Sequence, residues 1–547
     1  ANGEGGRVSR SRSETKNYNV RSSLRYKKSI DDFNFSGFVS HVASQYEFNY
    51  LYASGSKLVL PDGINIANTI VPIPGQGYTD EETTESYIAN ASVDAYDKYF
   101  LQATYTKDAS SRFVNNKWGD FYAVGASWAM SKEDFLAGVD FIDFLKFKMS
   151  YGVIGNSGGV GFYPGYNLYS VNNLDDNIAL AFDTKGNPDL TWEKSNQFNT
   201  GFEFELGGFV SGSIEYYKKI TNDMFFDRRV GPSVGYALLK VNDGEMVNSG
   251  IEFDLDFNIV DSSDFKLTIG INGESFKNEL TALPIDPSTG EEQKLDIDGR
   301  YGRTAGRSLY DWYMPVYSGV NELTGAAQWE RSYVDIDSSG DYNDGDEIIT
   351  NLTQYQNDNP SATILQDITE VYSEAADKFV NKTIIPDVRG SVRFNADYKN
   401  LSISALFNYS LGGYAYDSSY ATLMDNDYAG TNNFHTDIRG RWMNPGDKTD
   451  IPRQDARKQI QQNAASTRFL TKADYFGLNN VRIGYDLTPI LYSSLGVDKL
   501  EIFVTGDNLL FFSNRTGFNP STSVTGGSSS YRYNPLSTLV FGINLNL

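Results

Sequence analysis

Long stretches of this chain alternate apolar and polar side chains with a period of two, which is typical of β-strands that turn one face toward an apolar environment. Within residues 245–260, apolar side chains from Ile251 to Ile259 share one face, and acidic or amide side chains from Glu252 to Asn258 share the other. The same alternation recurs along most of the chain. A sequence with this pattern predicts a large all-β structure.

The alternation predicts about fifteen strands, many of them longer than ten residues. Strands in soluble domains usually have about five or six residues, whereas a tilted strand needs about nine to eleven to cross a bilayer. The predicted strands are residues 14–28, 33–50, 86–96, 99–108, 118–130, 144–155, 192–206, 209–226, 245–260, 264–279, 387–398, 401–416, 475–488, 498–511 and 534–547. Their length favours strands that cross a membrane.

Short and long connections alternate between the predicted strands. Tight turns are expected at residues 29–32, 97–98, 207–208, 261–263 and 399–400, and long extracellular loops at about residues 51–85, 156–191, 280–386 and 417–474. Short turns on one side and long loops on the other are typical of outer-membrane β-barrels. The predicted fold is therefore all-β: a transmembrane antiparallel β-barrel, to which residues 1–547 contribute one continuous portion.

A large secreted all-β protein with a buried core is the alternative fold, because alternation alone fits both. A closed barrel is favoured because lipid requires every backbone hydrogen-bonding group to be paired and leaves no free sheet edge. No stretch of the chain approaches the roughly 18 consecutive apolar residues that a membrane-spanning helix requires. A helical membrane protein is thereby excluded.

Composition argues against most enzyme and nucleic-acid functions. The 547 residues include 47 basic and 70 acidic side chains, and the net charge of −23 disfavours binding to phosphate backbones. The chain has no Cys and only two His, His41 and His435, which leaves little material for thiolate metal sites or His-based catalysis. Asp254 and Asp256 share one strand face, as a pair of catalytic carboxylates might. A polar barrel lumen explains this spacing without catalysis. No catalytic site is predicted.

The strand count carries a prediction about the whole barrel. If the short turns lie in the periplasm, the first predicted strand descends toward it, and the fifteenth also descends and ends there with Leu547. Bacterial single-chain barrels have even strand numbers. The chain is therefore expected to begin in an extracellular loop and to be the C-terminal part of a larger barrel, with an odd number of strands upstream.

Several stretches carry a family resemblance. Residues 97–156 contain DKYFLQATYTKDASSRF, KWGDFYAVGASWAMSKEDF and FLKFKMSYGVIGN, and four further matches follow in order: NPDLTWEKSNQFNTGFEF, NDGEMVNSGIEFDLDF, RWMNPGDKTDIPR and GDNLLFFSNRTGFNP. Together they resemble the SusC/RagA family of TonB-dependent outer-membrane transporters. Two departures are visible: the chain ends in NLNL where the family usually has a terminal aromatic residue, and Tyr475, Phe476 and Gly477 lack the arginine that the family usually carries there.

The resemblance implies a barrel of about 22 strands around an N-terminal plug domain. The strands predicted here would leave about seven strands and the plug to an upstream N-terminal half of the same transporter. The resemblance further implies energy-coupled import of a nutrient too large for porins, a glycan fragment or an oligopeptide, through the outer membrane of a Gram-negative, Bacteroidetes-like bacterium. The implied partners are a SusD-like lipoprotein over the mouth, the TonB complex acting through the plug, and the lipid bilayer.

Two other functions stay open on the sequence alone. A non-transporting outer-membrane barrel could act as a receptor or scaffold in a surface or secretion complex, and a plug with a TonB box upstream would separate it from an importer. A membrane-anchored or secreted hydrolase is the third possibility. It would need a convergent catalytic pair, and the sequence shows none.

Residues 335–346 form an acidic stretch, DIDSSGDYNDGD, with the spacing of a calcium-binding EF-hand loop. Oxygen-bearing side chains occupy positions 1, 3, 5, 7, 9 and 12, with Gly340 at position 6 for the sharp turn. The predicted ligands are Asp335, Asp337, Ser339, Asp341, Asn343 and Asp346. Ser339 at position 5, and Asp346 rather than Glu at position 12, depart from the pattern. Calcium is the cofactor predicted, and a solvated acidic loop tip is the alternative.

Aromatic side chains gather in and beside the last two predicted loops. Flat aromatic faces beside amide and acid groups suit sugar rings or peptide side chains. The predicted substrate-binding residues are Trp312, Tyr313, Trp329, Tyr414, Tyr416 and Tyr420. The alternative is a structural role, because barrels carry aromatic girdles at the membrane interfaces and long loops need cores of their own.

Overall fold

The computed structural model describes residues 5–286, 289–425, 433–455, 460–489, 498–523, 526 and 535–546. It contains one antiparallel sheet of 15 strands. These strands are β1 (Arg7–Ile30), β2 (Phe33–Leu58), β3 (Thr69–Ala95), β4 (Tyr99–Ser110), β5 (Trp118–Ala129), β6 (Ile142–Asn156), β9 (Glu193–Leu206), β10 (Val210–Asn222), β13 (Glu245–Asp261), β14 (Phe265–Ala282), β23 (Val388–Tyr398), β24 (Leu401–Leu411), β27 (Tyr475–Asp486), β28 (Lys499–Ser513) and β29 (Thr538–Asn546). Each predicted strand corresponds to one of them, so the all-β prediction is confirmed; the ends of the predicted strand 534–547 lie outside the described residues.

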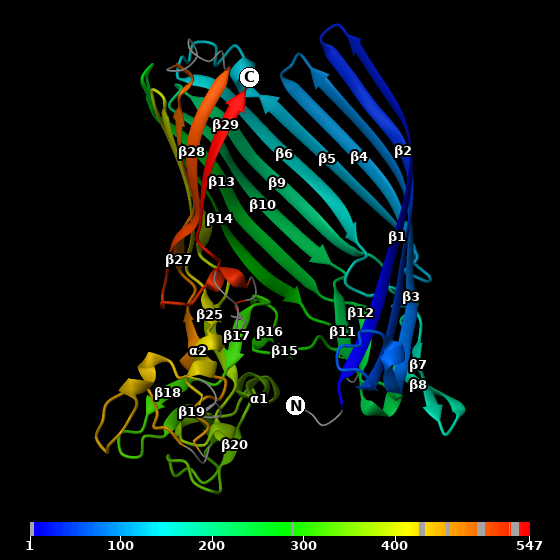
Figure 1. Cartoon of the computed structure of the whole chain (residues 1–547), viewed down its shortest axis with the longest axis vertical. Coiled ribbons are helices and arrows are strands. Elements are labelled where there is room, and N and C mark those ends of the chain that lie inside the picture. The colour runs from blue at the N-terminus through cyan, green and yellow to red at the C-terminus, as the bar shows by residue number, and fades with distance from the viewer. Residues whose placement is uncertain are drawn as a thin grey trace.

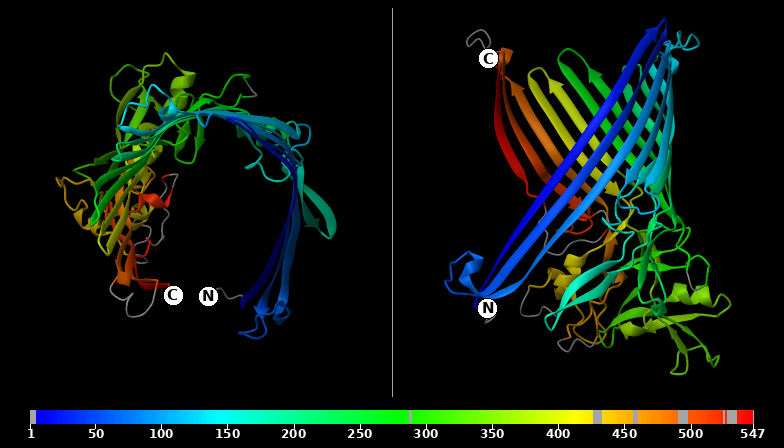
Figure 2. Two further views of the ribbon diagram at one scale, coloured as in Figure 1. Left: turned by 90° about the horizontal axis from the view of Figure 1, so that it is seen from above. Right: turned by 90° about the vertical axis from the view of Figure 1, so that its right-hand side faces the viewer.

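The large sheet curls into a barrel wall whose strands are inclined to its long axis (Figure 1). Viewed from above, the sheet follows much of a ring, with the first and last strands at its two edges (Figure 2). Within the described residues, β1 pairs only with β2, and β29 pairs only with β28. None of the described helices is long and apolar enough to cross a membrane. The wall therefore has a concave face toward the axis and a convex face outside.

The two faces of the wall differ in polarity, as the alternation predicts. On the convex face, Ile214 of β10 lies between Phe202 of β9 and Phe253 of β13. On the concave face, the preceding residue Ser213 lies between two acidic side chains, Glu203 and Asp254. The apolar convex side chains remain exposed in the isolated chain, for example Ile214 at 43% and Phe202 at 44%. An apolar outside and a polar inside are typical of barrels that lie in lipid.

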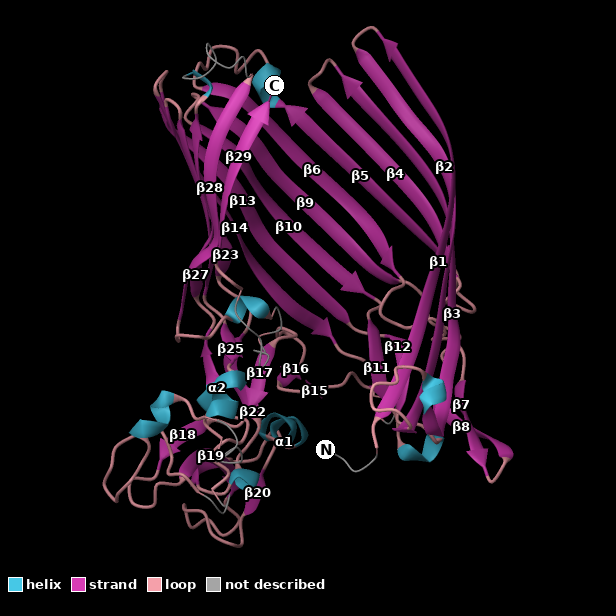
Figure 3. Ribbon diagram, in the orientation of Figure 1, coloured by secondary structure: helices cyan, strands magenta, loops and turns pink. Residues whose placement is uncertain are grey.

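Most connections at one end of the wall, which we call the turn end, are short turns, and the longest connections lie at the other end, which we call the loop end (Figure 3). The prediction of a loop at residues 51–85 is wrong for most of that range, because β2 continues to Leu58 and β3 already begins at Thr69. The backbone pairing of β2 with β3 continues through this region, with Leu51 opposite Gly77. Beyond the apolar band neither face needs to be apolar, so the alternation disappears while the backbone pairing persists.

The other long connections carry secondary structure of their own. The elements at the loop end are the hairpins β7 (Leu168–Leu174) with β8 (Asn177–Thr184) and β11 (Phe225–Arg229) with β12 (Leu238–Asn242), the strands β15 (Asp296–Asp298), β16 (Tyr301–Arg303), β17 (Asp311–Met314), β18 (Tyr317–Val320), β19 (Ala327–Val334), β20 (Glu347–Ile349), β21 (Leu365–Thr369), β22 (Lys378–Thr383), β25 (Tyr414–Tyr416) and β26 (Leu470–Lys472), and the helices α1 (Leu352–Asp358) and α2 (Ser418–Leu423). We call the described residues of 296–383 and 414–472 the loop domain. Parts of the predicted loops 280–386 and 417–474 lie outside the described residues.

Polar and aromatic side chains mark the turn end of the convex face. Glu133 accepts hydrogen bonds from the Tyr99 hydroxyl (2.6 Å), Trp128 Nε1 (3.0 Å) and Lys98 Nζ (3.1 Å). These bonds, the one from Tyr99 foremost, lower the pKa of Glu133 from 4.5 to about 2. The Tyr99 and Trp128 rings stack with centroids 6.5 Å apart. Such amphipathic rings are typical of the aromatic girdle at a membrane interface.

Replacing Glu133 by Gln is expected to make acid stability less dependent on pH. A carboxyl group whose pKa is lower in the folded than in the unfolded protein stabilises the fold fully above its unfolded pKa, and that contribution disappears as the pH falls through its folded pKa. For Glu133 this window runs from pH 4.5 down to about 2. We expect the wild-type unfolding temperature, measured by heat-modifiability on gels, to fall faster across this window than that of the variant. Parallel curves would contradict the prediction.

Candidate functional site: the concave wall and the loop domain

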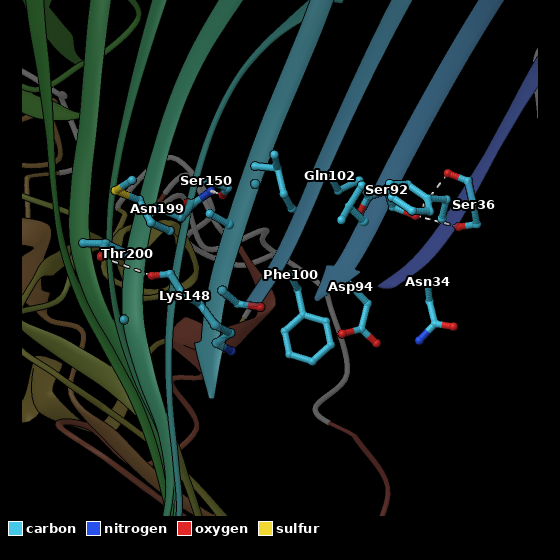
Figure 4. Close-up of a pocket in the computed structure, with 18 of the residues that line it drawn as sticks. Asn34, Ser36, Ser92, Asp94, Phe100, Gln102, Lys148, Ser150, Asn199 and Thr200 are labelled. Carbon is cyan, nitrogen blue, oxygen red and sulfur yellow. Dashed lines mark hydrogen bonds between the residues drawn. The ribbon is translucent and has the colours of Figure 1, made fainter. Parts of the chain in front are cut away.

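A hollow of about 680 Å³ indents the concave face near the turn end, and we call it the lumenal hollow (Figure 4). Its lining comes from the eight neighbouring strands β1 to β6, β9 and β10. The residues labelled in Figure 4 are Asn34, Ser36, Ser92, Asp94, Phe100, Gln102, Lys148, Ser150, Asn199 and Thr200. All but one of them carry a polar side chain. The hollow is therefore a surface for water, polar solutes or a polar protein segment.

Hydrogen bonds satisfy only part of this polar lining. The hydroxyls of Ser36 and Ser92 lie 2.6 Å apart, and Lys148 Nζ donates to Glu215 at 2.7 Å. Asp94, at the edge of the hollow in Figure 4, has a buried carboxylate oxygen without a hydrogen-bond partner among the described residues. Buried polar groups are normally paired. The lumenal hollow thus keeps hydrogen-bonding capacity for a group that comes from outside this part of the chain.

Farther round the concave face, ion pairs link neighbouring strands. Arg393 of β23 donates to Asp254 at 2.5 Å and to Asp256 at 2.9 Å, both on β13. Arg482 of β27 donates to Glu501 of β28 at 2.5 Å. Each of these guanidinium groups neutralises carboxylates on a neighbouring strand. The paired carboxylates of the sequence lie on a charged, hydrated wall, as a polar lumen requires.

The structure buries four of the six predicted substrate-binding residues within the loop domain. The exposed fraction is 1% for Trp312, 3% for Tyr313, 0% for Trp329 and 3% for Tyr416. Trp312 and Tyr416 belong to one hydrophobic cluster, and Trp329 belongs to another. Burial leaves these side chains no surface for a substrate, which corrects the prediction for all four. Their physical role is to form the cores that a folded region of this size requires.

Tyr414 and Tyr420 are the two predicted substrate-binding residues that keep part of their surface. The Tyr414 ring lies beneath Lys382, with Nζ 4.5 Å from its centroid. The Tyr420 ring contacts the Arg515 guanidinium at 3.5 Å, and its hydroxyl donates to Asp437 at 2.9 Å. Burial, followed by this hydrogen bond, raises the pKa of Tyr420 to about 12. Tyr420 therefore remains a protonated hydrogen-bond donor at neutral pH.

The acidic stretch 335–346 forms a tight loop between β19 and β20. Carboxylate oxygens of Asp335, Asp337 and Asp346 lie within 4.8 Å of one another. The backbone amides of Ser339 and Gly340 both donate to Asp335, at 3.1 and 2.8 Å. Gly340 has a φ of 86°, a left-handed conformation that glycine adopts without steric cost. The loop therefore closes around its first aspartate.

The remaining predicted ligands lie around the same turn. The Ser339 hydroxyl donates to the backbone carbonyl of Asp341 at 2.9 Å, and the Asn343 side-chain amide donates to Asp337 at 3.0 Å. Hydrogen bonds from Ser339 are the largest cause of the lowered pKa of Asp337. The carboxylate of Asp337 is therefore ionised at neutral pH. Ionised carboxylate oxygens converging on a glycine-containing turn are the ligand type that a hard cation such as calcium prefers.

Sequence reasoning missed the apolar face of the β7–β8 hairpin, which lies inside the predicted loop 156–191. Val171 pairs with Leu180, and Tyr169 pairs with Phe182, so these side chains share one face of the hairpin. The exposed fraction is 75% for Val171 and 65% for Leu180. Short alternations in LYSVNNL and NIALAFDT were the available signal. Exposed apolar patches of this kind mark interaction surfaces.

Comparisons with known proteins agree with this architecture. The family model described as TonB dependent receptor-like, beta-barrel matches residues 2–369, more than half of the chain. TonB-dependent receptor P39 of Formosa agariphila is 27% identical over 480 residues, which cover 84% of this chain and 46% of that protein. TonB-dependent receptor SusC of Bacteroides thetaiotaomicron is 23% identical over 491 residues, which cover 86% of this chain and 44% of that protein.

A solved structure of the RagAB peptide transporter has a similar fold. It superposes with a TM-score of 0.81 at 24% identity, and the match covers 99% of this chain and 56% of that chain. The chain spans about half the length of the curated relatives it matches. The predicted outer-membrane location is confirmed. With its 15-stranded wall, apolar convex face and matching family model, the chain belongs to the TonB dependent receptor-like β-barrel family.

Proposed function

We propose that this chain forms much of the barrel wall of a TonB-dependent importer for a nutrient too large for porins, either a glycan fragment or an oligopeptide. The observation that carries the proposal is the polar concave wall, which keeps hydrogen-bonding capacity at the lumenal hollow and leads to a folded loop domain. A polar solute loses less hydration along such a wall than along an apolar one. Tyr414 and Tyr420 are the proposed substrate contacts in the loop domain.

We propose that strands outside this sequence complete the barrel and that a plug domain occupies its lumen. The matched regions cover only 44% to 54% of the curated relatives. The outer edges of β1 and β29 also present backbone groups that lipid does not satisfy. A plug against the lumenal hollow would supply polar partners for residues such as Asp94. The TonB complex would act on the barrel through that plug.

A SusD-like lipoprotein is the proposed partner at the loop end. The apolar face of the β7–β8 hairpin supports this assignment, because a two-stranded hairpin is only marginally stable unless its apolar face is covered. A protein lid that packs on Val171 and Leu180 would bury that face.

Deleting the gene is expected to abolish uptake of one class of labelled nutrient in whole cells. Oligopeptides and oligosaccharides are supplied separately, so the class that stops entering identifies the substrate. A plasmid copy should restore uptake, and collapsing the proton gradient should stop it again, because TonB draws on that gradient. If uptake of both classes survives the deletion while a surface or secretion complex loses its assembly, the barrel is a scaffold instead of an importer.

We propose that the loop 335–346 binds one calcium ion through the side chains of Asp335, Asp337, Ser339, Asn343 and Asp346, with Asp341 contributing from the same turn. Calcium would tie β19 to β20 in the loop domain by neutralising the converging carboxylates. The geometry that supports this is the convergence of three aspartates within 4.8 Å around Gly340. Extracellular calcium modules typically bind with dissociation constants of about 0.1 to 1 mM.

Changing Asp337 to Asn is expected to weaken calcium binding about tenfold or more, since a bound dication loses one of its anionic ligands. Asp344→Asn is the matched control, because Asp344 occupies position 10 of the same loop and is not a predicted ligand. Binding is measured by isothermal titration of the full-length protein with CaCl₂. The absence of calcium-dependent heat in the wild type, or equal effects of both substitutions, would reject the site.

A further inference from the structure

The convex face carries a shallow hollow of about 600 Å³ across β1 to β5, which we call the outer hollow. Its floor consists of small residues, Gly37, Ala89, Ala91 and Ala103. Register places Ala91 between Gly37 and Ala103, so the floor runs across three adjacent strands. A Cβ atom on Gly37 would lie 2.7 Å from the backbone carbonyl oxygen of Asn90. Close approach of β3 therefore requires glycine there and keeps the floor low.

Larger apolar side chains form the two sides of the outer hollow. Leu24 and Tyr26 of β1 stand on one side, and Tyr105 of β4 and Tyr122 of β5 stand on the other. Leu24 and Tyr26 are 73% and 63% exposed. Adjacent strands are about 4.8 Å apart, so the space between these sides is roughly 10 to 15 Å wide. This width accommodates extended hydrocarbon chains about two abreast.

A row of polar and aromatic residues adjoins the outer hollow on the side toward the loop end. The row crosses β2 to β5 two residues beyond the hollow on each strand. In it, His41 pairs with Tyr87, Tyr87 pairs with Lys107, and Lys107 pairs with Asp120. We call these four residues, together with Glu85 and Trp118, the outer polar row. All belong to the convex face, and we assign the row to the membrane interface on the side of the loop end, because polar and aromatic side chains there follow the apolar hollow.

The outer polar row offers aromatic faces and oxygen acceptors but few free positive charges. Glu85 accepts hydrogen bonds from the Tyr87 hydroxyl at 2.8 Å and lies 3.0 Å from His41 Nε2. Lys107 lies 3.5 Å from Asp120, and the Tyr105 hydroxyl donates to the same carboxylate. Each cation thus already has an anionic partner.

The aromatic rings of the row lie side by side. Tyr87 stacks on His41 at 4.8 Å and on Trp118 at 6.1 Å, measured between ring centroids. Tyr87 and Trp118 remain 49% and 43% exposed. Rings that remain partly exposed beside carboxylates offer apolar contacts to the C–H groups of a sugar and hydrogen-bond acceptors to its hydroxyls, whereas a phosphate group would meet Glu85 and Asp120 and be repelled.

We propose that the outer hollow and the outer polar row together bind one saccharide-headed lipid of the outer leaflet. Its acyl chains lie against Gly37, Ala91 and Ala103, and its sugar lies against Tyr87 and Trp118. The apolar hollow is continuous with the membrane-facing surface, which assigns the occupant to the bilayer. The order of apolar hollow and polar row along the strands matches the order of chain and head group in the outer leaflet. The proposal is independent of what the barrel transports.

The test compares lipid retention by the full-length protein. The protein is reconstituted in phosphatidylethanolamine vesicles that contain diglucosyl diacylglycerol, an uncharged glycolipid, extracted in mild detergent, and examined by native mass spectrometry. We expect the wild type to retain the diglucosyl lipid about tenfold more than phosphatidylethanolamine at equal concentration. Ala103→Leu, which fills the floor, should remove most of this retention. Ala405→Leu, on the convex face of β24 outside the hollow, is the matched control and should leave it unchanged.

A second variant separates the head group from the chains. Trp118→Ala leaves the hollow open, so it should reduce retention of the diglucosyl lipid toward the phosphatidylethanolamine level without changing the latter. Heat-modifiability on gels establishes that each variant is folded. Equal retention of both lipids by the wild type would overturn the saccharide assignment. Retention that is insensitive to Ala103→Leu, or a protein dimer in place of bound lipid, would overturn the site itself.

Discussion

Arginine at position 214 is expected to destabilise the folded barrel by about 2 to 4 kcal/mol, which is the cost of a basic residue on the lipid-facing side near the bilayer midplane. Ile214 lies on the convex face of β10, between Phe202 and Phe253. Ile214 lies about midway between the turn after β9 and Lys218, the first charged residue on the same face of β10 toward the loop end. Position 214 therefore lies well inside the apolar band.

Ser213→Arg is the matched control, because the two positions are adjacent in sequence and face opposite sides of the wall. Ser213 lies between Glu203 and Asp254 on the concave face. An arginine there gains two carboxylate neighbours and stays in water, so we expect its effect on stability to be small. Both variants introduce an arginine at adjacent positions of the same strand, so the contrast between them reports which face of the wall meets lipid.

The two variants are compared in the full-length protein by unfolding in urea from lipid vesicles, with outer-membrane abundance as a second readout. A destabilisation of about 2.8 kcal/mol changes the folded-to-unfolded ratio about a hundredfold, so the contrast is easily measured. Equal effects of Ile214→Arg and Ser213→Arg would mean that the convex face does not contact lipid. That outcome would contradict the assignment of the convex face to lipid.

The strands of the wall could be predicted from the sequence because lipid imposes a strict physical pattern on them. A strand with one face in lipid and one in water must alternate, as β13 does from Val247 to Ile259. Where β2 and β3 continue beyond the apolar band, no face needs to be apolar. The sequence there reads as a loop, although the backbone pairing continues from Leu51 to Leu58.

The loop end was less predictable because its aromatic residues serve two purposes that look alike in sequence. An exposed tryptophan that stacks on a ligand and a buried tryptophan that fills a core have the same neighbours in the chain. Only the folded structure, in which both rings are fully buried, shows that Trp312 and Trp329 belong to cores. The acidic loop 335–346 stays a predicted calcium site, in which three of the six predicted ligands, Asp335, Asp337 and Asp346, have carboxylate oxygens within 4.8 Å of one another.

Truncating Trp312 to Ala is expected to unfold the loop domain while leaving the barrel intact. Deleting a fully buried aromatic side chain typically costs about 3 to 5 kcal/mol through lost burial and the cavity left behind. Trp312 packs against Tyr301 at 4.7 Å and Tyr416 at 6.4 Å between ring centroids. Its Nε1 donates to the backbone carbonyl of Tyr414 at 2.9 Å, and the substitution leaves that buried acceptor unpaired.

Hydrogen exchange and limited proteolysis of the full-length protein in detergent separate the two parts of the structure. We expect faster exchange across β15 to β22 in Trp312→Ala, while the β9–β10 and β13–β14 pairs of the wall keep their protection, because the cluster around Trp312 lies within the loop domain. Trp442→Ala is the matched control, since Trp442 is only half-buried and donates to the carbonyl of Glu322 at the edge of the domain. Its effect should be clearly smaller.

The same variant decides between a core and a substrate contact for Trp312. If the ring supports the core, exchange protection and nutrient uptake fall together, because the loop domain that carries Tyr414 and Tyr420 loses its shape. If the ring were a substrate contact, uptake would fall while exchange protection stayed at the wild-type level. With 1% of its surface exposed, Trp312 is expected to give the first result, which would leave the two half-buried tyrosines as the residues to test for substrate binding.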